Sequence, residues 1–414
     1  MHATRVRAVL TARLILWITA KKAGAGLAFA LSAAVLANAQ TSPADLKGKT
    51  AEQVFKNIQV LQGTPADQFI QSMHLIQGAL GVTCFYCHVS PSFVDAPKDD
   101  KAPKLAARRM ITMVQEINKN SFGGRQVVTC YTCHRGSITP IAVPLLPAVQ
   151  PEEPKPAPDL AMPTVDRILD KYVQALGGEQ ALRKITSRLI TATQNIPTGP
   201  GGQNLIAAQA EQYQKAPNLT LNVYRAPAYT TSNGFDGVTQ WAQDQNGVVA
   251  DASQLDTMRA RRAADLLEPL DLNQEYTRMV VRGIEKVNDR DAYVVIALPP
   301  GDKAERLYFD VQTGLLVRKY SALPTPVGDS PLQMDYDDYR DTGTGVKIPF
   351  VIHMSPASLH SELQTYTTIQ VQKVQDNVAI DDSKFVKPLS NPAPGPAPAP
   401  TPSAAPPPSA APAP

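Results

Sequence analysis

The sequence predicts a multidomain chain, in which a mainly α-helical unit is followed by an α+β unit with an antiparallel sheet. Its 414 residues exceed the length of one compact domain. Twelve of the 37 prolines lie between Pro388 and Pro414 and eight between Pro140 and Pro163, which indicates a tail and a linker. Apolar residues recur with helical spacing before the linker and mostly with strand-and-turn spacing after it. The predicted segments are 1–39, 40–140, 141–163, 164–388 and 389–414.

Residues 1–39 have the pattern of a secretory signal peptide. They contain five basic residues and no acidic one, an apolar run from Ala23 to Leu36, and then Ala37-Asn38-Ala39. This order of basic region, apolar region and small-x-small site predicts cleavage after Ala39 and export to the periplasm or cell envelope. The alternative is an uncleaved membrane anchor, which the earlier apolar stretch 14–20 favours. Beyond this segment no apolar run is long enough to span a bilayer.

The charge balance argues against a nucleic-acid partner. The formal net charge is +3, from 40 basic and 37 acidic residues. Five of the basic residues belong to the predicted signal peptide, so the mature chain has a formal charge of −2. A nearly neutral chain lacks the basic excess that nucleic-acid binding requires.

All four cysteines lie in two copies of one motif, Cys84-Phe85-Tyr86-Cys87-His88 and Cys130-Tyr131-Thr132-Cys133-His134. C-x-x-C-H is the attachment signature of c-type haem. Cysteines at i and i+3 lie on one side of a helical turn, where each thiol can add to a haem vinyl group. The histidine that follows can then ligate the iron. The sequence therefore predicts two covalently bound haem c groups.

Three other interpretations of the cysteines are weaker. Disulfides suit an exported chain, but they do not require a histidine after each pair. A zinc site of four thiolates also leaves the paired histidines unexplained. A thioredoxin-like redox pair belongs in a βαβ setting, which the sequence does not show.

Each haem iron needs a sixth ligand, usually methionine or histidine. A helix is predicted to begin at Thr64-Pro65, as N-cap and first position, and to stop at Gly81. One of its faces carries Phe69, Met73, Ile76 and Leu80. Met73 is the candidate ligand on this face, and His74 is its rival, pointing about 100° away.

A second helix of the same design follows Ala102-Pro103. One of its faces carries Ala106, Met110, Met113 and Ile117. Helix, short connection and C-x-x-C-H thus form an internal repeat, in which Met73 and Met110 hold equivalent places. A methionine on such a face is often core filler, and periodicity does not separate Met110 from Met113.

The segment from Ala51 through Gly136 resembles the cytochrome c subunit of photosynthetic reaction centres. The stretches that carry the resemblance are Ala51-Glu52-Gln53-Val54-Phe55-Lys56-Asn57, Val60-Leu61-Gln62-Gly63-Thr64, Ala107-Arg108-Arg109-Met110, Ile117-Asn118-Lys119-Asn120 and Val128-Thr129-Cys130-Tyr131-Thr132-Cys133-His134-Arg135-Gly136. In that family a methionine on the helix before each motif is the usual sixth ligand. The resemblance therefore implies a mainly α-helical dihaem cytochrome c domain, with Met73 and Met110 as axial ligands and Met113 as packing.

The chain also departs from that family. The family's subunit has four haem segments, and this chain has one pair. The family's further histidine ligand before the second motif is missing from Ser121-Phe122-Gly123-Gly124-Arg125, and so is its lipid-bearing cysteine. A partnership with a photosynthetic reaction centre is therefore not implied.

Arg108 and Arg109 adjoin Met110 and are candidates to pair with a haem propionate. Residues 40–140 carry eleven basic and seven acidic side chains, so four propionates would make the loaded domain nearly neutral. The alternative is a solvated basic face.

In the block 164–388 the sequence pattern predicts one N-terminal helix, with an apolar face from Val165 to Leu176. A series of strands and turns follows, interrupted by a helix near residues 254–267. The pattern resembles the half-barrel sheet of periplasmic lipoprotein-carrier and anti-sigma-regulator domains. His353 and His360 are isolated and are expected in solvent or core roles. No nucleophile elbow, phosphate loop or metal triad occurs in this block.

These observations predict an exported dihaem cytochrome c that carries single electrons between an unidentified redox donor and acceptor. Its second domain would serve for docking or ligand binding. Because histidine and methionine would fill both axial positions, we expect no enzyme activity. The alternatives are a dihaem peroxidase-like oxidoreductase, which needs an open iron site, and an envelope redox sensor or binding protein.

Overall fold

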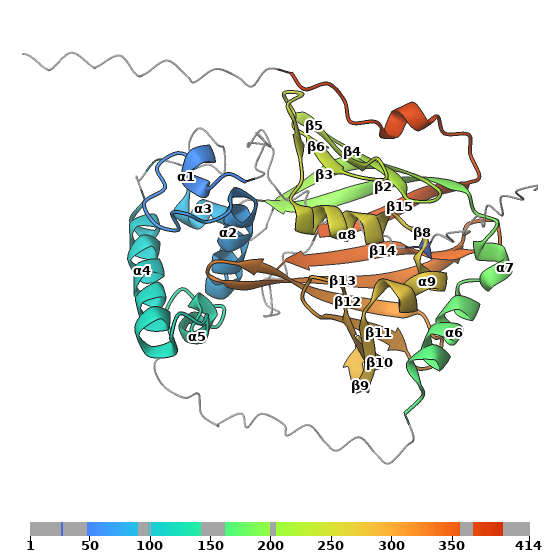
Figure 1. The fold of residues 1–414 in the computed structure, drawn as a ribbon, viewed down its shortest axis with the longest axis horizontal. Coiled ribbons are helices and arrows are strands. Elements are labelled where there is room, and N and C mark those ends of the chain that lie inside the picture. The colour runs from blue at the N-terminus through green and yellow to red at the C-terminus, as the bar shows by residue number, and fades with distance from the viewer. Residues whose placement is uncertain are drawn as a thin grey trace, which may run out of the picture.

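A computed structural model describes residues 26–27, 48–89, 98, 101–141, 162–198, 204–356 and 367–391. In these ranges a helical part precedes a large antiparallel sheet (Figure 1). The predicted linker and tail fall almost wholly outside the described residues, as does the predicted signal peptide apart from residues 26–27. None of the helices in the described part combines the length and the apolar composition needed to cross a bilayer.

The helical part has two long helices, each followed by a short helical turn. The elements are α1 (Ala51–Val54), α2 (Ala66–Leu80), α3 (Cys84–Cys87), α4 (Ala102–Phe122) and α5 (Cys130–His134). Both predicted long helices are confirmed, including the stop at Gly81, whose positive φ of 65° ends α2. The predicted start of α2 is one residue too early. Pro65 is the N-cap, with an extended ψ of 130°, and Thr64 is buried beside α1.

The sheet contains thirteen strands, and every neighbouring pair is antiparallel. They are β2 (Ser187–Thr198), β3 (Asn204–Lys215), β4 (Leu219–Ala226), β5 (Tyr229–Phe235), β6 (Gln240–Gln243), β7 (Val249–Asp251), β9 (Arg278–Val287), β10 (Arg290–Leu298), β11 (Glu305–Asp310), β12 (Leu316–Thr325), β13 (Gly328–Asp341), β14 (Lys347–Pro356) and β15 (Thr367–Asp376). The order β7-β6-β5-β4-β3-β2-β15-β14-β13-β12-β11-β10-β9 joins two meanders at the β2–β15 pair. The predicted antiparallel sheet is confirmed, and it is an open one.

A buried ion pair fixes the register where the two meanders meet. Arg188 and Asp376 are direct cross-strand partners on β2 and β15, and both side chains are almost fully buried. The carboxylate of Asp376 also accepts hydrogen bonds from the hydroxyls of Thr342 and Thr344. A buried charge of this kind is tolerated because its partners are in place, and a slip by one residue would leave it unpaired.

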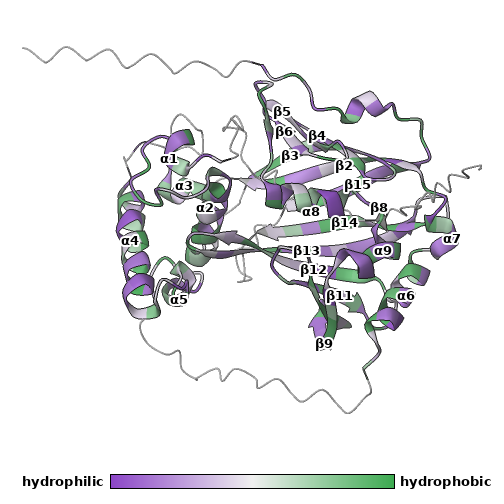
Figure 2. Cartoon of the chain, viewed as in Figure 1, coloured by the Kyte–Doolittle hydropathy of each residue, from purple (hydrophilic) through white to green (hydrophobic). Residues whose placement is uncertain are grey.

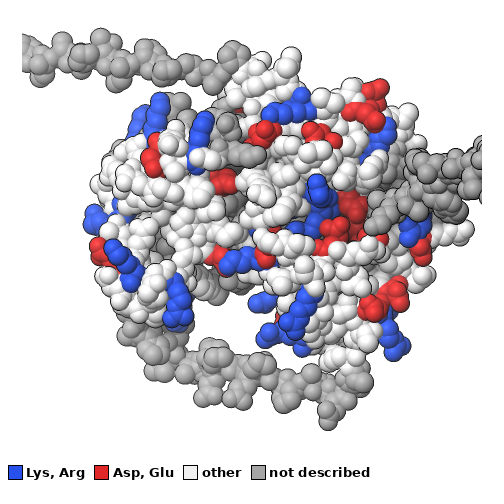
Figure 3. Space-filling view, in the orientation of Figure 1, with Lys and Arg blue, Asp and Glu red and all other residues white. Residues whose placement is uncertain are grey.

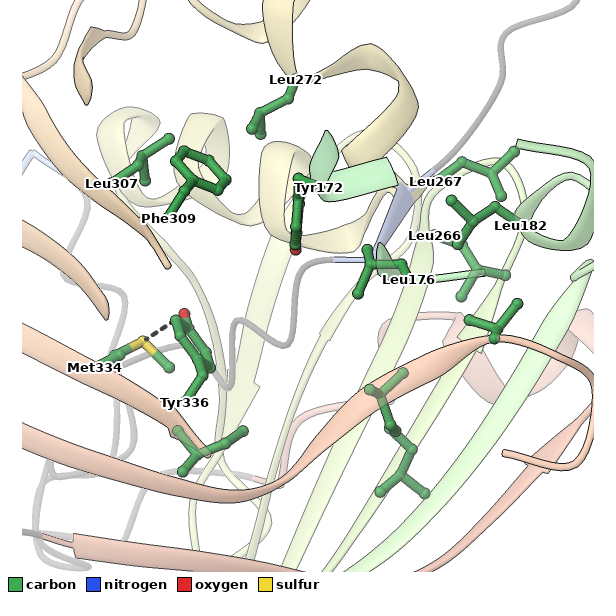
Figure 4. Packing of buried hydrophobic residues seen from close by; sticks show 14 of the residues in the cluster. Tyr172, Leu176, Leu182, Leu266, Leu267, Leu272, Leu307, Phe309, Met334 and Tyr336 are labelled. Carbon is green, nitrogen blue, oxygen red and sulfur yellow. Dashed lines mark hydrogen bonds between the residues drawn. The ribbon is translucent and has the colours of Figure 1, made fainter. Parts of the chain in front are cut away.

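The main hydrophobic core lies between the sheet and the helices that cover it. These are α6 (Val165–Ala175), α7 (Glu179–Leu182) and α9 (Glu268–Glu275). The helix α8 (Gln254–Ala264) forms a separate small cluster with Phe235, and a short η4 (Asp382–Phe385) lies near the C-terminal end. Figure 4 shows Tyr172 of α6 beside Phe309 of β11, and Leu176, which directly follows α6, near Leu266. In Figure 2, α6 and α9 each carry green apolar stretches next to purple polar ones. The strand pattern supplies one apolar face, and the helices bury it.

A charged network ties α8 to the turn between β10 and β11. Arg259 pairs with Asp302 at 2.6 Å, and Arg262 pairs with Glu305 at 3.3 Å. Figure 3 shows basic and acidic side chains gathered side by side near the middle of the visible face, in the region of α8 and α9. Directly after α8, the two-residue strand β8 (Leu266–Leu267) pairs with β1 (Gly26–Leu27). The predicted helix near 254–267 therefore ends three residues early.

Candidate haem-binding site

Both C-x-x-C-H motifs form single helical turns, α3 and α5. Each turn begins after a threonine in extended conformation, Thr83 or Thr129. The two cysteines of each motif are therefore one helical turn apart on the same side, as attachment to a haem requires. All four cysteines are free thiols, so the structure does not show the disulfide alternative. Among the described residues, no three His, Cys, Asp or Glu side chains converge as ligands for one metal ion.

Burial keeps three of these thiols protonated. Desolvation raises the pKa of Cys84, of Cys87 and of Cys130 above the ordinary value for cysteine. At Cys87 the charges of Lys101 and Lys104 oppose this effect without reversing it. Cys84, Cys87 and Cys130 are therefore neutral thiols at neutral pH.

The second motif holds its histidine in a defined tautomer. Nδ1 of His134 lies 2.9 Å from the carbonyl oxygen of Ser137. A carbonyl oxygen only accepts hydrogen bonds, so Nδ1 must donate, and the lone pair of the neutral ring lies on Nε2. A ring nitrogen hydrogen-bonded in this way orients the other nitrogen toward a metal. The sequence showed the histidine, but not the carbonyl that orients it.

The start of α4 is fastened to the first motif. The Lys101 ammonium donates a hydrogen bond to the carbonyl oxygen of Phe85, inside the Cys84–Cys87 turn. His88 directly follows this turn and forms its C-cap, with its amide donating to the carbonyl oxygen of Cys84 at 2.9 Å. The first motif is therefore held by the helix that follows it in sequence.

The helix α2 packs against the second motif. The backbone amide of Gly136 donates to the carbonyl oxygen of Ala79 at 2.9 Å. A Cβ atom at Gly81 would lie 2.2 Å from the carbonyl oxygen of Gly136, so only glycine allows this approach. Together with the contact of α4 on α3, this packing interlocks the two halves of the repeat.

Met73 lies on α2, partly buried in a cluster with Leu61, Leu75 and Ile76. Cys130 of the second motif packs on the same cluster. The rival ligand His74 follows Met73, and burial lowers the pKa of His74 to about 4. Its imidazole is therefore neutral at pH 7.

Met110 and Met113 are both exposed on α4, each to 40%. Lys104 is buried near the start of this helix, and its buried face further along is formed by Ile111, Val114 and Asn118 rather than by the methionines. These lie one position later in the sequence, about 100° around the helix. A polar residue completes this buried face, so apolar periodicity alone does not reveal it. Because the two side chains are equally exposed, their exposure does not show which of Met110 and Met113 is the better candidate ligand.

Asn118 organises the connection to the second motif, a role that sequence reasoning missed. Its side chain is 6% exposed. Its Oδ1 accepts hydrogen bonds from the amides of Val127 and Val128, at 3.0 and 2.9 Å, and its Nδ2 donates to the carbonyl oxygen of Val128 at 2.7 Å. The sequence did contain one signal, which is that Asn118 lies on the same helical face as Ile111 and Val114.

The two arginines before Met110 lie in different surroundings. The guanidinium of Arg108 donates to the carbonyl oxygen of Asn57 at 3.0 Å, while Arg109 is exposed. Helix geometry places Arg109 about 40° from Met113, and Arg108 more than 100° from both methionines. Of the two, Arg109 is better placed for a propionate near the methionine face, and this pairing stays a prediction.

The residues present fit a covalent haem. Each turn offers two thiols one helical turn apart and a histidine directly behind them. Each long helix offers a methionine thioether, and His134 has its Nε2 free of the Ser137 hydrogen bond. This set of donors is the one that c-type haem uses.

Residues 22–161 match the family model described as photosynthetic reaction centre cytochrome C subunit. The photosynthetic reaction center cytochrome c subunit of Rubrivivax gelatinosus is 36% identical over 104 residues, which are 24% of this chain and 27% of that protein. Cytochrome c-554 of Chloroflexus aurantiacus is 35% identical over 88 residues, or 20% of each chain. The chain thus spans about a quarter or less of the length of these relatives. The predicted resemblance of the C-x-x-C-H segment to this family is confirmed.

Solved structures are also similar to this chain. A DUF1329 family protein from Desulfovibrio piger is 14% identical and covers 54% of this chain and 97% of its own, with a TM-score of 0.38. A LolA superfamily protein from Nitrosomonas europaea is 12% identical and covers 55% of this chain and 99% of its own, with a TM-score of 0.37.

Proposed function

We propose that this protein is an exported dihaem c-type cytochrome that transfers single electrons. The observation that carries the proposal is the repeated unit of a long helix with a methionine and a C-x-x-C-H turn. The similarity of the same segment to reaction-centre cytochromes and to cytochrome c-554 supports it. A redox donor and a redox acceptor are its proposed partners.

In this proposal each residue of the motif has one task. Cys84 and Cys87 hold one haem through thioethers, and Cys130 and Cys133 hold the other. His88 and Met73 would ligate the first iron, and His134 and Met110 would ligate the second. The haem supplies one-electron redox chemistry, and the chain supplies ligands, burial and position. With a histidine and a methionine on each iron, no position would be left open to a substrate.

The sheet part is proposed as a docking or ligand-binding unit. A groove of about 470 Å³ opens between β4–β6 and the segment 383–388. Leu221 and Trp241 form part of its apolar lining, and Lys384 contributes positive charge, while the ammonium of Lys387 pairs with Asp251 at 2.7 Å. These features support binding of an apolar group that carries a negative charge.

Haem attachment tests the proposal directly. Acid-acetone extraction should leave the haem on the wild-type protein, and the pyridine haemochrome spectrum should give two haems per chain. In Cys84→Ala one haem should keep a single thioether and mature poorly, while the haem of the second motif stays intact. Haem that extracts freely would contradict the proposal.

Ligation is the second test. A redox titration with visible and near-infrared spectra should show methionine–iron charge transfer at both haems. Carbon monoxide should bind slowly or not at all to the reduced protein. Rapid binding would favour the peroxidase-like alternative.

A further inference from the structure

The tip of the β12–β13 hairpin, residues 325–328, reaches out of the sheet and packs into the helical part (Figure 1). Val327 at this tip is 5% exposed. It belongs to one cluster with Leu61, Leu75 and Ile111, which come from the α1–α2 connection, α2 and α4. A side chain from the second part of the chain thus completes the core of the first.

Polar contacts hold the tip in this position. The side-chain amide of Gln126 donates to the carbonyl oxygens of Thr325, at 3.2 Å, and Pro326, at 2.5 Å. Within the tip, the Thr325 hydroxyl accepts from the amide of Val327 at 3.3 Å and donates to the carbonyl oxygen of Gly328. The turn is therefore organised internally and anchored to the segment just before the second motif.

The tip lies against the residues that flank the proposed haem ligands. A Cβ atom on Gly328 would lie 3.0 Å from the side chains of both Leu75 and Thr129. Leu75 is two residues from Met73, and Thr129 is the N-cap of the turn that begins at Cys130. Met73 and Cys130 themselves pack on the cluster that contains Val327.

We propose that this hairpin tip is a positioning element of the haem-binding unit, which holds α2 against α5 and excludes water from their junction. The proposal rests on the proposed function, since it concerns how the haems are held. Water stabilises the more highly charged oxidised haem, so an apolar seal favours the reduced state and raises the midpoint potential. The sheet part thereby tunes the haem that its own chain carries.

The test compares three full-length variants with the wild type. Val327→Asn places a polar amide in the apolar cluster without adding charge. Gln126→Ala removes both anchoring hydrogen bonds at an exposed side chain. Val238→Asn is the matched control, because Val238 lies in the β5–β6 turn of the same sheet and is 71% exposed. Haem content, the two midpoint potentials and urea unfolding are measured for each.

We expect Val327→Asn to lower the midpoint potential of at least one haem relative to Val238→Asn, and Gln126→Ala to lower it by less. In urea, haem absorbance should change before Trp241 fluorescence in Val327→Asn, and together with it in the wild type. If Val327→Asn does not fold, the midpoint potentials of Gln126→Ala test the proposal in its place.

If the variants carry two haems per chain with unchanged midpoint potentials, this inference is overturned and the proposed function stands. A shift in unfolding alone would show that the contact is only structural. A wild type without covalent haem overturns the proposed function as well.

Discussion

Single side chains and carbonyl groups set the chemistry of the candidate site. The carbonyl oxygen of Ser137 fixes which nitrogen of His134 can face a metal. Desolvation keeps Cys84 and Cys130 as neutral thiols. These effects depend on the immediate surroundings of each side chain, so single substitutions can test them.

Met110→Leu should remove the methionine–iron charge-transfer band of one haem, lower its potential and let carbon monoxide bind there. Met113→Leu nearly conserves volume and should cost less than about 1.5 kcal/mol of stability, leaving the band intact. Near-infrared spectra of both variants decide the assignment. The reverse pattern would make Met113 the ligand.

Asn118→Ala should destabilise the helical part by about 1–2 kcal/mol, because it removes three hydrogen bonds that tie α4 to the backbone of Val127 and Val128. Asn120→Ala on the same helix is the control, since Asn120 is exposed and should tolerate the change. Urea unfolding followed by haem absorbance measures both. If Asn118→Ala were as stable as Asn120→Ala, water would have taken over the hydrogen bonds of the Asn118 side chain.

At the scale of elements, the junction of α2 with α5 joins the two halves of the repeat. The end of α2 approaches the residue after the second motif so closely that no side chain fits at Gly81. The end of α4 has the same left-handed glycine, Gly123, with φ 62°, but open space around it. The chain therefore contains its own control for this contact.

Gly123→Ala should cost about 1 kcal/mol, the strain of alanine in the left-handed conformation. Gly81→Ala bears the same strain and also the clash with Gly136, so it should cost about 1–3 kcal/mol more. Thermal or urea unfolding of the two variants gives this difference directly. Similar losses would mean that the α2–α5 junction relaxes easily.

At the scale of the whole molecule, the sheet part contains acidic groups that folding makes hard to ionise. Burial, with the charges of Glu268, Glu275 and Asp271, raises the pKa of Asp265 to about 8. Burial raises the pKa of Glu268 to about 7, although Lys319 opposes it. The folded state therefore binds protons that the unfolded chain has already lost above about pH 4.

The stability of the sheet part should consequently fall as the pH rises from about 4 to about 8, because in this window the folded state holds more protons than the unfolded state. Asp265→Asn should flatten this dependence and stabilise the protein at pH 8. Asp170→Asn, at an exposed carboxylate of α6, is the control. Urea midpoints at pH 5 and pH 8 test the sign. A rise in stability with pH would contradict it.

Several features followed from the sequence because they depend on residues close together in the chain. The spacing in C-x-x-C-H predicted both turns. Pro103 and Gly81 marked a helix start and a helix stop, and alternating strands with turns predicted an antiparallel sheet. The resemblance of the C-x-x-C-H segment to reaction-centre cytochromes was visible in the same local stretches.

Only the tertiary structure decided which distant segments meet. Gln126 bonds to residues about 200 positions later, and Val327 completes a cluster begun by Leu61. No local sequence pattern marks these contacts. An apolar side chain such as Val327 suits any core of the right shape, and the side chain of Gln126 can bond to any carbonyl group within reach. The core face of α4 was missed for the same reason. Its position depends on the side from which α2 and the hairpin approach, and Asn118 is buried there because the loop it binds folds back over it.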